Sequence, residues 1–229
     1  MPSATAQRLA HASRALGRAP PRLHGFDGDY AAAHVWPDHD LFSSDDVRSL
    51  LDEPVHGRYV SLRAALTKVA DGVRLGTATG VVAGYGTRWT ARNPKRWDIT
   101  LSDAWVDEAR RINGSFAKAD ENARSVRKMR GCGRAKVVWH AMLVRPGSPS
   151  QEDHVDAQGS KCYYTYVVPL EGRANGGGTF FPHMGLAFQQ IGGAVLFRGD
   201  VLHRGLGNQS TEDRVFLYAA IFAGEDPNE

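Results

Sequence analysis

Two histidines and one aspartate have the residue types and the spacing of a metal site. His154 and Asp156 stand in His-Val-Asp, the only His-x-Asp among the nine histidines. In an extended segment, side chains two positions apart point to the same face, so the imidazole and the carboxylate can approach one ion together. His203, from a distant segment, supplies a third ligand. This set suits iron(II) and leaves coordination positions open, although a hydrolytic zinc site can use the same residue types.

Arg214 opens a strongly apolar run, residues 215–222, which predicts a central strand buried on both faces. An arginine that points inward from such a strand needs an anionic partner. Its planar fork matches a carboxylate through two parallel hydrogen bonds, and the distal carboxylate of 2-oxoglutarate would fit. The alternatives are exposure at the start of the strand, or a pair with Glu212 or Asp213.

Short motifs follow one another in a fixed order through about the last 90 residues. In that order they resemble the prolyl-4-hydroxylase-like branch of the iron(II)/2-oxoglutarate-dependent dioxygenases. Each motif is loose, but their order and spacing together are fairly specific. The motifs are His154-Val155-Asp156, the YYTYVVPL run at 163–170, the GGGTFFP run at 176–182, the GGAVLF run at 192–197, His203-Arg204-Gly205 and Arg214.

The resemblance implies a role for each matching residue. His154, Asp156 and His203 would bind iron(II), and Arg214, eleven positions after the second histidine, would grip 2-oxoglutarate. The implied reaction uses O2, releases succinate and CO2, and hydroxylates a C–H bond, with Asp156 favouring hydroxylation over halogenation. The substrate would be a peptide or protein, for example at a prolyl residue, or a small molecule. A nucleic-acid oxygenase of the same superfamily and a non-catalytic, cupin-like metal-binding module remain alternatives.

Two departures from the family pattern concern the cosubstrate and the substrate. Val144-Arg145-Pro146-Gly147 stands where the family often has Tyr-x-Pro-Gly, so one cosubstrate contact is missing or moved. Tyr164 or Tyr166, which share one face of the next strand, are candidates to replace it. The family's asparagine after Tyr-Leu is also absent, since the dipeptide here is Pro169-Leu170. Both changes weaken the case for a prolyl peptide as substrate.

Helical patterns come first along the chain and short strand patterns follow, which predicts one domain, residues 1–229, that is mainly β with flanking helices (α+β). The expected architecture is a double-stranded β-helix, or jelly roll, with a helical N-terminal half. We expect an arm at 1–25, mostly helical support at 26–135 and the jelly-roll core at 136–229. Ser43 with Asp46 forms a capping-box pattern, and Ser102 is a second cap. The helices and strands expected from periodicity are a helix after each cap, a polar helix at 118–129, and strands at 81–83, 136–144, 161–170, 178–181, 194–197 and 214–222.

Composition limits the protein's setting. The formal charge of +3 is mild, and no apolar run is long enough to cross a bilayer. The two cysteines, Cys132 and Cys162, form no disulfide framework, so a reducing, cytoplasmic location is expected. The first 26 residues lack acids, which also allows an organelle-targeting segment. The basic stretch 109–136 is read as a solvated helical face, with nucleic acid as the less favoured partner.

Overall fold

Two antiparallel sheets of unequal size form the β part of the computed structural model, which describes residues 35–38, 40–54, 60–74, 81–82, 85–89, 95–125, 136–156, 162–173 and 177–222. The larger sheet has eight strands and the smaller has three, and no strand belongs to both. In spatial order the large sheet contains β1 (Val35–Asp38), β9 (Ala194–Arg198), β6 (Cys162–Glu171), β11 (Arg214–Phe222), β5 (Lys136–Val144), β4 (Arg96–Thr100), β3 (Tyr85–Trp89) and β2 (Val81–Val82). The small sheet contains β10 (Arg204–Gly205), β7 (Thr179–Phe181) and β8 (Leu186–Phe188).

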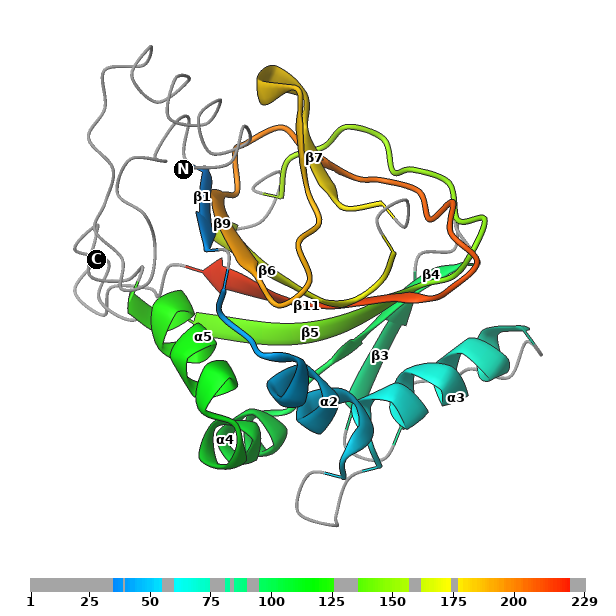
Figure 1. Ribbon diagram of the computed structural model, residues 1–229, viewed down its shortest axis with the longest axis vertical. Coiled ribbons are helices and arrows are strands. Elements are labelled where there is room, and N and C mark those ends of the chain that lie inside the picture. The colour runs from blue at the N-terminus through cyan, green and yellow to red at the C-terminus, as the bar shows by residue number, and fades with distance from the viewer. Residues whose placement is uncertain are drawn as a thin grey trace.

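The helices gather on one face of the large sheet, and the strand β7 of the small sheet lies over the other face (Figure 1). The helices on that face are α2 (Ser44–Asp52), α3 (Leu62–Arg74), α4 (Asp103–Ile112) and α5 (Gly114–Ser125). A short 3-10 helix, η5 (Pro182–Met184), links β7 to β8 in the small sheet. Two facing sheets with helices behind the larger one confirm the expected jelly roll with helical support.

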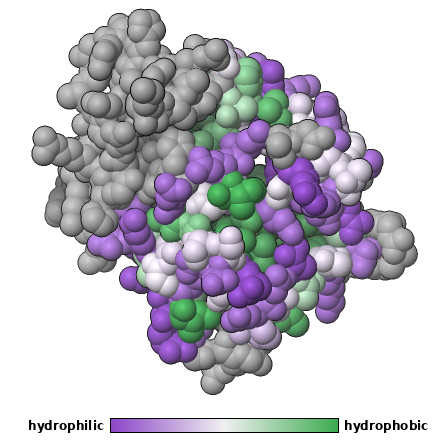
Figure 2. All heavy atoms as spheres, viewed as in Figure 1, coloured by the Kyte–Doolittle hydropathy of each residue, from purple (hydrophilic) through white to green (hydrophobic). Residues whose placement is uncertain are grey.

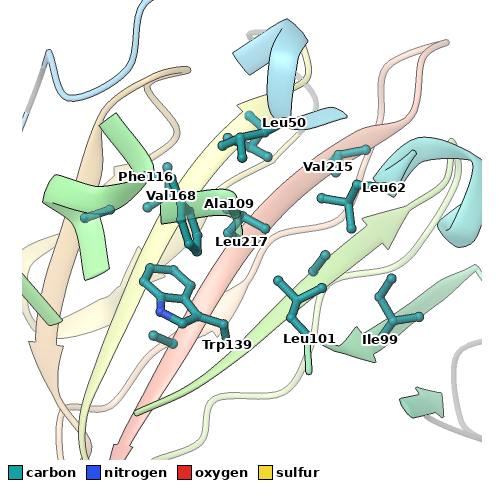
Figure 3. Packing of buried hydrophobic residues seen from close by; sticks show 14 of the residues in the cluster. Leu50, Leu62, Ile99, Leu101, Ala109, Phe116, Trp139, Val168, Val215 and Leu217 are labelled. Carbon is teal, nitrogen blue, oxygen red and sulfur yellow. The ribbon is translucent and has the colours of Figure 1, made fainter. Parts of the chain in front are cut away.

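Apolar side chains join the helices to the large sheet. Leu217 and Trp139 from the sheet meet Phe116 and Leu50 from the helices in one buried cluster (Figure 3). Trp139 is 1% exposed, and its indole N–H donates to the buried carboxylate of Asp120 at 2.8 Å. Because alternate residues of a strand face opposite sides, this packing leaves the other face of the same strands free for a site.

Side-chain caps fix where two of the helices begin. Ser43 and Asp46 form the expected capping box, and the hydroxyl of Ser102 accepts the Trp105 N–H at the start of α4. The third helix begins earlier than position 118, because the side chain of Asn113 accepts the N–H of Phe116 at 2.8 Å and so caps α5 at Gly114. Residues 126–129 of the expected helix lie outside the described part of the chain.

Strands also occur in the N-terminal half, where mostly helical support was expected. The strands β1 to β4 all precede residue 101, and β4 pairs with β5 along its whole length. The strand expected at 81–83 is present as Val81–Val82, and residue 83 is outside the described part. The strand β4 was not predicted: its polar residues Arg96, Asp98 and Thr100 alternate with Trp97 and Ile99, and the charged side chains of Arg96 and Asp98 are buried. Their burial points to a polar interior on that side of the sheet.

Several arginines in the described part of the basic stretch 109–136 form ion pairs with nearby acidic residues. Arg110 and Arg124 both approach the buried Asp120, at 3.1 and 2.6 Å, and Arg111 pairs with Glu108 at 2.6 Å. These pairs agree with a solvated helical face, and hydrophilic residues predominate on the surface seen in Figure 2. In the described ranges, no helix has the length and apolar character needed to span a membrane. The N-terminal arm and Cys132 lie outside those ranges, as does the side chain of Cys162.

Candidate metal and cosubstrate site

A backbone bridge brings the two histidines of the expected metal site together. His154 and His203 pair directly as an isolated antiparallel bridge, with N–H to carbonyl distances of 2.9 and 3.0 Å in the two directions. Residues paired in this way carry their side chains on the same face, and the two rings lie 4.5 Å apart between centroids. Two segments that are distant in sequence thus present adjacent imidazoles.

Each imidazole is oriented by its own backbone. Nδ1 of His154 lies 2.8 Å from the carbonyl oxygen of Glu152, and Nδ1 of His203 lies 3.0 Å from that of Val201. A hydrogen bond from Nδ1–H to a carbonyl leaves Nε2 deprotonated and free to bind a metal. Burial lowers the pKa of His203, although the charge of Asp156 opposes this effect, and a lowered pKa favours the neutral imidazole that metals require.

Asp156 completes the group. Its carboxylate oxygens lie 3.9 Å from Nε2 of His154 and 3.7 Å from Nε2 of His203, and the hydroxyl of Thr165 on β6 donates to Oδ2. One ligand atom from each of the three residues lies within 4.8 Å of the others. In the described part of the chain, this is the one cluster of at least three histidine, cysteine or acidic residues with that geometry. The donor set and its spacing therefore fit a single divalent ion.

The three side chains face a cavity of about 490 Å³ between the two sheets. The cavity extends along β11, where Phe216 and Tyr218 line it, and Arg214 stands at the start of that strand. Arg214 is 6% exposed, so the alternative of a solvent-exposed arginine is wrong. Burial, and secondarily the positive charge of Arg96, lower the pKa of Arg214 to about 9. A buried cation of this kind favours an anionic ligand in the cavity.

Arg96 is a second buried arginine of the cavity, and sequence reasoning missed it. It is 2% exposed, and burial lowers its pKa to about 10. Its Nη2 donates to the carbonyl oxygen of Leu206 at 3.0 Å, and the Nη1 of Arg214 reaches the same oxygen at 3.3 Å. The signal that would have found it is the alternation in Arg-Trp-Asp-Ile-Thr, which is the period-two pattern of a strand.

Two glycines make room for the arginines. A Cβ on Gly177, whose φ is +92°, would lie 2.2 Å from Nη1 of Arg214, and a Cβ on Gly205 would lie 2.8 Å from Nη1 of Arg96. A side chain at Gly177 would collide with the guanidinium of Arg214 and the carbonyl of Gly207, and one at Gly205 would collide with the side chains of Gln151 and Arg96. Gly177 and Gly205 therefore both lie against the end of the cavity that contains the two arginines.

The expectation that Tyr164 or Tyr166 contacts the cosubstrate is corrected. Both side chains belong to the buried cluster on the helix-covered face of β6, and Tyr166 packs edge-on against Trp139 at 6.0 Å. The cavity is lined instead by the alternate residues of that strand, Thr165 and Val167. The two tyrosines do share one face, as expected, but it is the face opposite the site.

Four further polar residues form a small network on the cavity side of the sheet. The hydroxyl of Tyr218 donates to Asp98, and the ring of Tyr218 stacks on that of His140 at 4.6 Å with an angle of 5° between the planes. Nδ1 of His140 lies 3.6 Å from Asp98 and 3.3 Å from the hydroxyl of Thr100. His140 thus faces the cavity while its neighbour Trp139 faces the helices. The side chain of His183 lies outside the described part of the structure.

No protein-family model matches the chain, and no curated protein matches it by sequence. Solved structures do match its fold. A viral collagen prolyl hydroxylase from Paramecium bursaria Chlorella virus-1, in complex with 2-oxoglutarate, has a TM-score of 0.52 at 14% identity and covers 84% of this chain and 97% of its own. A prolyl-4-hydroxylase from Pseudomonas putida has a TM-score of 0.53 at 15% identity, with coverages of 94% and 99%.

The similarity extends to enzymes of another kind. The non-haem α-ketoglutarate-dependent carbocyclase SnoK, from nogalamycin biosynthesis, has a TM-score of 0.53 at 11% identity and covers 90% of this chain and 87% of its own. At such identities the matches establish architecture and leave the reaction and the substrate open. The protein has the jelly-roll fold of the 2-oxoglutarate-dependent oxygenases, prolyl hydroxylases among them.

Proposed function

We propose that the protein is an iron(II)- and 2-oxoglutarate-dependent dioxygenase that hydroxylates a C–H bond. The observation that carries the proposal is the convergence of His154, Asp156 and His203, with ligand atoms within 4.8 Å of one another, on a cavity that also contains a buried arginine. The chemistry that iron(II) would supply there is activation of O2 together with decarboxylation of 2-oxoglutarate to succinate and CO2, which delivers one oxygen atom to the substrate.

The chain's own residues hold the participants in place. The carbonyls of Glu152 and Val201 fix the two imidazoles with Nε2 directed toward the carboxylate of Asp156. Thr165 donates to one oxygen of that carboxylate and so restricts its rotation. Arg214 offers a guanidinium, whose planar fork suits the distal carboxylate of 2-oxoglutarate. Preorganised ligands of this kind increase metal affinity, because less freedom is lost on binding.

The similarity in fold and the size of the cavity support a proposal for the substrate class. A cavity of about 490 Å³ falls in the range of small-molecule sites and leaves space beside the cosubstrate for one side chain of a peptide or for a small molecule. The fold is shared with collagen and bacterial prolyl hydroxylases and with an enzyme of antibiotic biosynthesis. We propose a peptide, including a prolyl residue, or a small molecule as substrate, with a nucleic acid less favoured.

Succinate formation tests the proposal. Purified protein with iron(II), 2-oxoglutarate and O2 is assayed for succinate, with prolyl peptides, free amino acids and nucleosides screened by mass spectrometry for a gain of one oxygen atom. We expect iron-dependent turnover that Asp156→Ala abolishes. Asp153→Ala is the matched control, because that aspartate pairs with Arg204 at 2.7 Å and is not in the metal cluster.

The outcomes separate the rival functions. Metal binding without succinate formation across the panel would support a cupin-like binding module. Hydrolysis that depends on zinc would support a hydrolase. Full 2-oxoglutarate consumption by the Asp156→Ala protein would contradict the assignment of the metal ligands.

A further inference from the structure

We propose that Arg96 and Arg214 together form a two-arginine clamp for the distal carboxylate of the cosubstrate. The inference rests on the proposed function and deepens it, because it adds a binding residue from a strand that no family motif covers. Arg96 is carried by β4, and the motifs all lie after residue 150. The geometry of the large sheet, the convergence of the two guanidinium groups and their burial support the clamp.

The sheet register places the two arginines on the same face. Val144 of β5 pairs with Arg214 of β11 on one side and with Arg96 of β4 on the other. Directly paired residues of antiparallel strands point to the same face, so the three side chains form one row across three strands. Both arginines line the cavity. Because they flank a short apolar residue, their long side chains can turn toward each other above it.

The guanidinium groups meet at one backbone oxygen. Nη2 of Arg96 and Nη1 of Arg214 reach the carbonyl of Leu206 at 3.0 and 3.3 Å. Arg96 also lies 3.4 and 3.5 Å from the carbonyls of Pro149 and Gly205. These contacts hold the two cations beside each other at the wall of the cavity.

The charges of the pair favour an anion between them. Burial lowers the pKa of both groups, and the charge of Arg96 lowers that of Arg214 further. A carboxylate in contact with both offsets the repulsion, and its two oxygens can accept hydrogen bonds from two donors at once. The neighbouring row of the sheet contains Asp98, Met142, Phe216 and Pro169. The carboxylate of Asp98 accepts a hydrogen bond from the hydroxyl of Tyr218, and the row adds no further cation.

The clamp also accounts for a missing cosubstrate contact. The family resemblance predicts a tyrosine at position 144, and the residue here is valine. The candidates on the next strand, Tyr164 and Tyr166, face the helices. Arg96 of β4 pairs with Val144, so its guanidinium can provide a polar contact in the same row of the sheet as position 144. The contact has therefore moved one strand across the sheet.

A binding role must be separated from a structural role, because Arg96 also holds backbone carbonyls near the histidines. The two roles differ in their dependence on the ligand. A residue that grips the distal carboxylate matters for 2-oxoglutarate but not for 2-oxopentanoate, a 2-oxo acid of the same chain length without that carboxylate. A residue that only supports the backbone affects both ligands equally.

The experiment measures binding without turnover. Full-length protein loaded with manganese(II) is titrated with 2-oxoglutarate and with 2-oxopentanoate by calorimetry, and its Tm is recorded. We expect Arg96→Ala to weaken 2-oxoglutarate binding by about 10- to 100-fold, equivalent to about 1.4–2.8 kcal/mol, while the affinity for 2-oxopentanoate changes by less than about threefold. Arg96→Gln keeps donors for the carbonyls and should show the same selectivity loss, and Arg96→Lys a smaller one.

Arg173→Ala is the matched control. Arg173 also lines the cavity, but it is exposed and bonded to Glu212, so its loss should leave both affinities unchanged. If Arg96→Ala does not fold, the ratio of the two affinities in Arg96→Gln decides. Equal weakening of both ligands, or no weakening of 2-oxoglutarate, would overturn the clamp. Failure of the parent protein to bind 2-oxoglutarate with saturating metal would instead refute the proposed function.

Discussion

The two faces of the large sheet are built from the same strands, but buried charged residues occur mainly on one of them. On β5, Trp139, Ala141 and Leu143 are buried against the helices, while His140 and Met142 line the cavity. On the helix side the aromatic rings of Trp105, Phe116, Trp139 and Tyr166 follow one another at 5.1–6.0 Å. The cavity side also has an apolar cluster, which includes Val167, Phe181 and Phe197, but it buries charged and polar groups as well. Because alternate residues of a strand face opposite sides, the helix-covered face mainly provides packing that stabilises the fold, and the cavity face provides the groups that could bind ligands.

The difference has an energetic consequence. Edge-to-face aromatic packing and removal of apolar surface from water stabilise the fold. Burial of charges such as those of Arg96 and Arg214 costs solvation free energy, which an anionic ligand would help to offset. Substitutions on the helix side should consequently act on the free energy of unfolding, and substitutions on the cavity side should act on ligand binding. Four variants test this division, from the largest expected effect to the smallest.

Trp139→Ala should produce the largest effect, on stability. Loss of a fully buried indole typically costs about 3–5 kcal/mol, and the change also removes the hydrogen bond to Asp120. Urea denaturation followed by circular dichroism measures the free energy of unfolding. Met142→Ala, on the same strand but facing the cavity, is the control and should cost less. Equal losses from the two substitutions would mean that the cavity face contributes to stability as much as the helix face.

Arg214→Ala should change binding rather than stability. Two charge-assisted hydrogen bonds to one carboxylate are lost, so 2-oxoglutarate affinity should fall by about 100-fold, or about 2.8 kcal/mol. Iron(II) affinity should hardly change, because Arg214 is not in the metal cluster. Arg214→Lys should recover affinity in part, since it keeps the charge but loses the fork. A change within about threefold, measured at saturating iron, would place the cosubstrate elsewhere.

The helix face and the metal group were the parts most accessible from the sequence. Strands at 136–144 and 214–222 have the expected bounds, because their β-branched and aromatic residues are continuous and turn residues flank them. The capping box at Ser43 was visible as a local pattern. His154 and Asp156 were recognisable because a two-residue spacing on an extended segment implies a shared face. All of these inferences use interactions between residues close in sequence.

The cavity face was less accessible, because its residues meet only in three dimensions. Arg96 was not singled out from the sequence, because only the pairing of β4 with β5 places it in one row with Arg214. For Tyr164 and Tyr166, the sequence indicated a common face but not which one. That choice depends on how the strand sits between its neighbours, and a shift of one residue reverses every side chain.

Thr165→Val should produce a moderate effect on metal binding. Valine keeps the shape of threonine but removes the hydroxyl that donates to Asp156. Loss of a hydrogen bond to a metal ligand typically lowers metal affinity by about 10- to 100-fold, and we expect the lower end because both histidine anchors remain. Thr100→Val is the control: its hydroxyl contacts His140 on the same face of the sheet, outside the metal cluster. Equal iron(II) affinities for the two variants would contradict a positioning role for Thr165.

Ser43→Ala should give the smallest effect, and it belongs wholly to the helix side. Removal of a serine N-cap typically costs about 1 kcal/mol, and 2-oxoglutarate affinity should not change. Burial raises the pKa of Asp46, but hydrogen bonds from the side chain and backbone of Ser43 and from the side chain of Ser115 outweigh it, so the net pKa is lowered. A carboxyl group whose pKa is lower in the folded state stabilises the protein at pH values above its pKa in the unfolded state. This stabilisation is lost as the pH falls through the pKa of the folded state.

The cost of Ser43→Ala should therefore be greater at pH 7 than at an acidic pH that protonates Asp46, because the ionised carboxylate is the acceptor for Ser43. Ser102→Ala supplies the matched comparison, because Ser102 caps α4 through the N–H of Trp105 and has no acid at the corresponding position. Its cost should be similar at the two pH values. Urea denaturation of both variants and the parent at each pH measures the difference. A pH-independent cost for Ser43→Ala would mean that its hydroxyl acts on the helix backbone alone and that the carboxylate of Asp46 adds nothing to the cap.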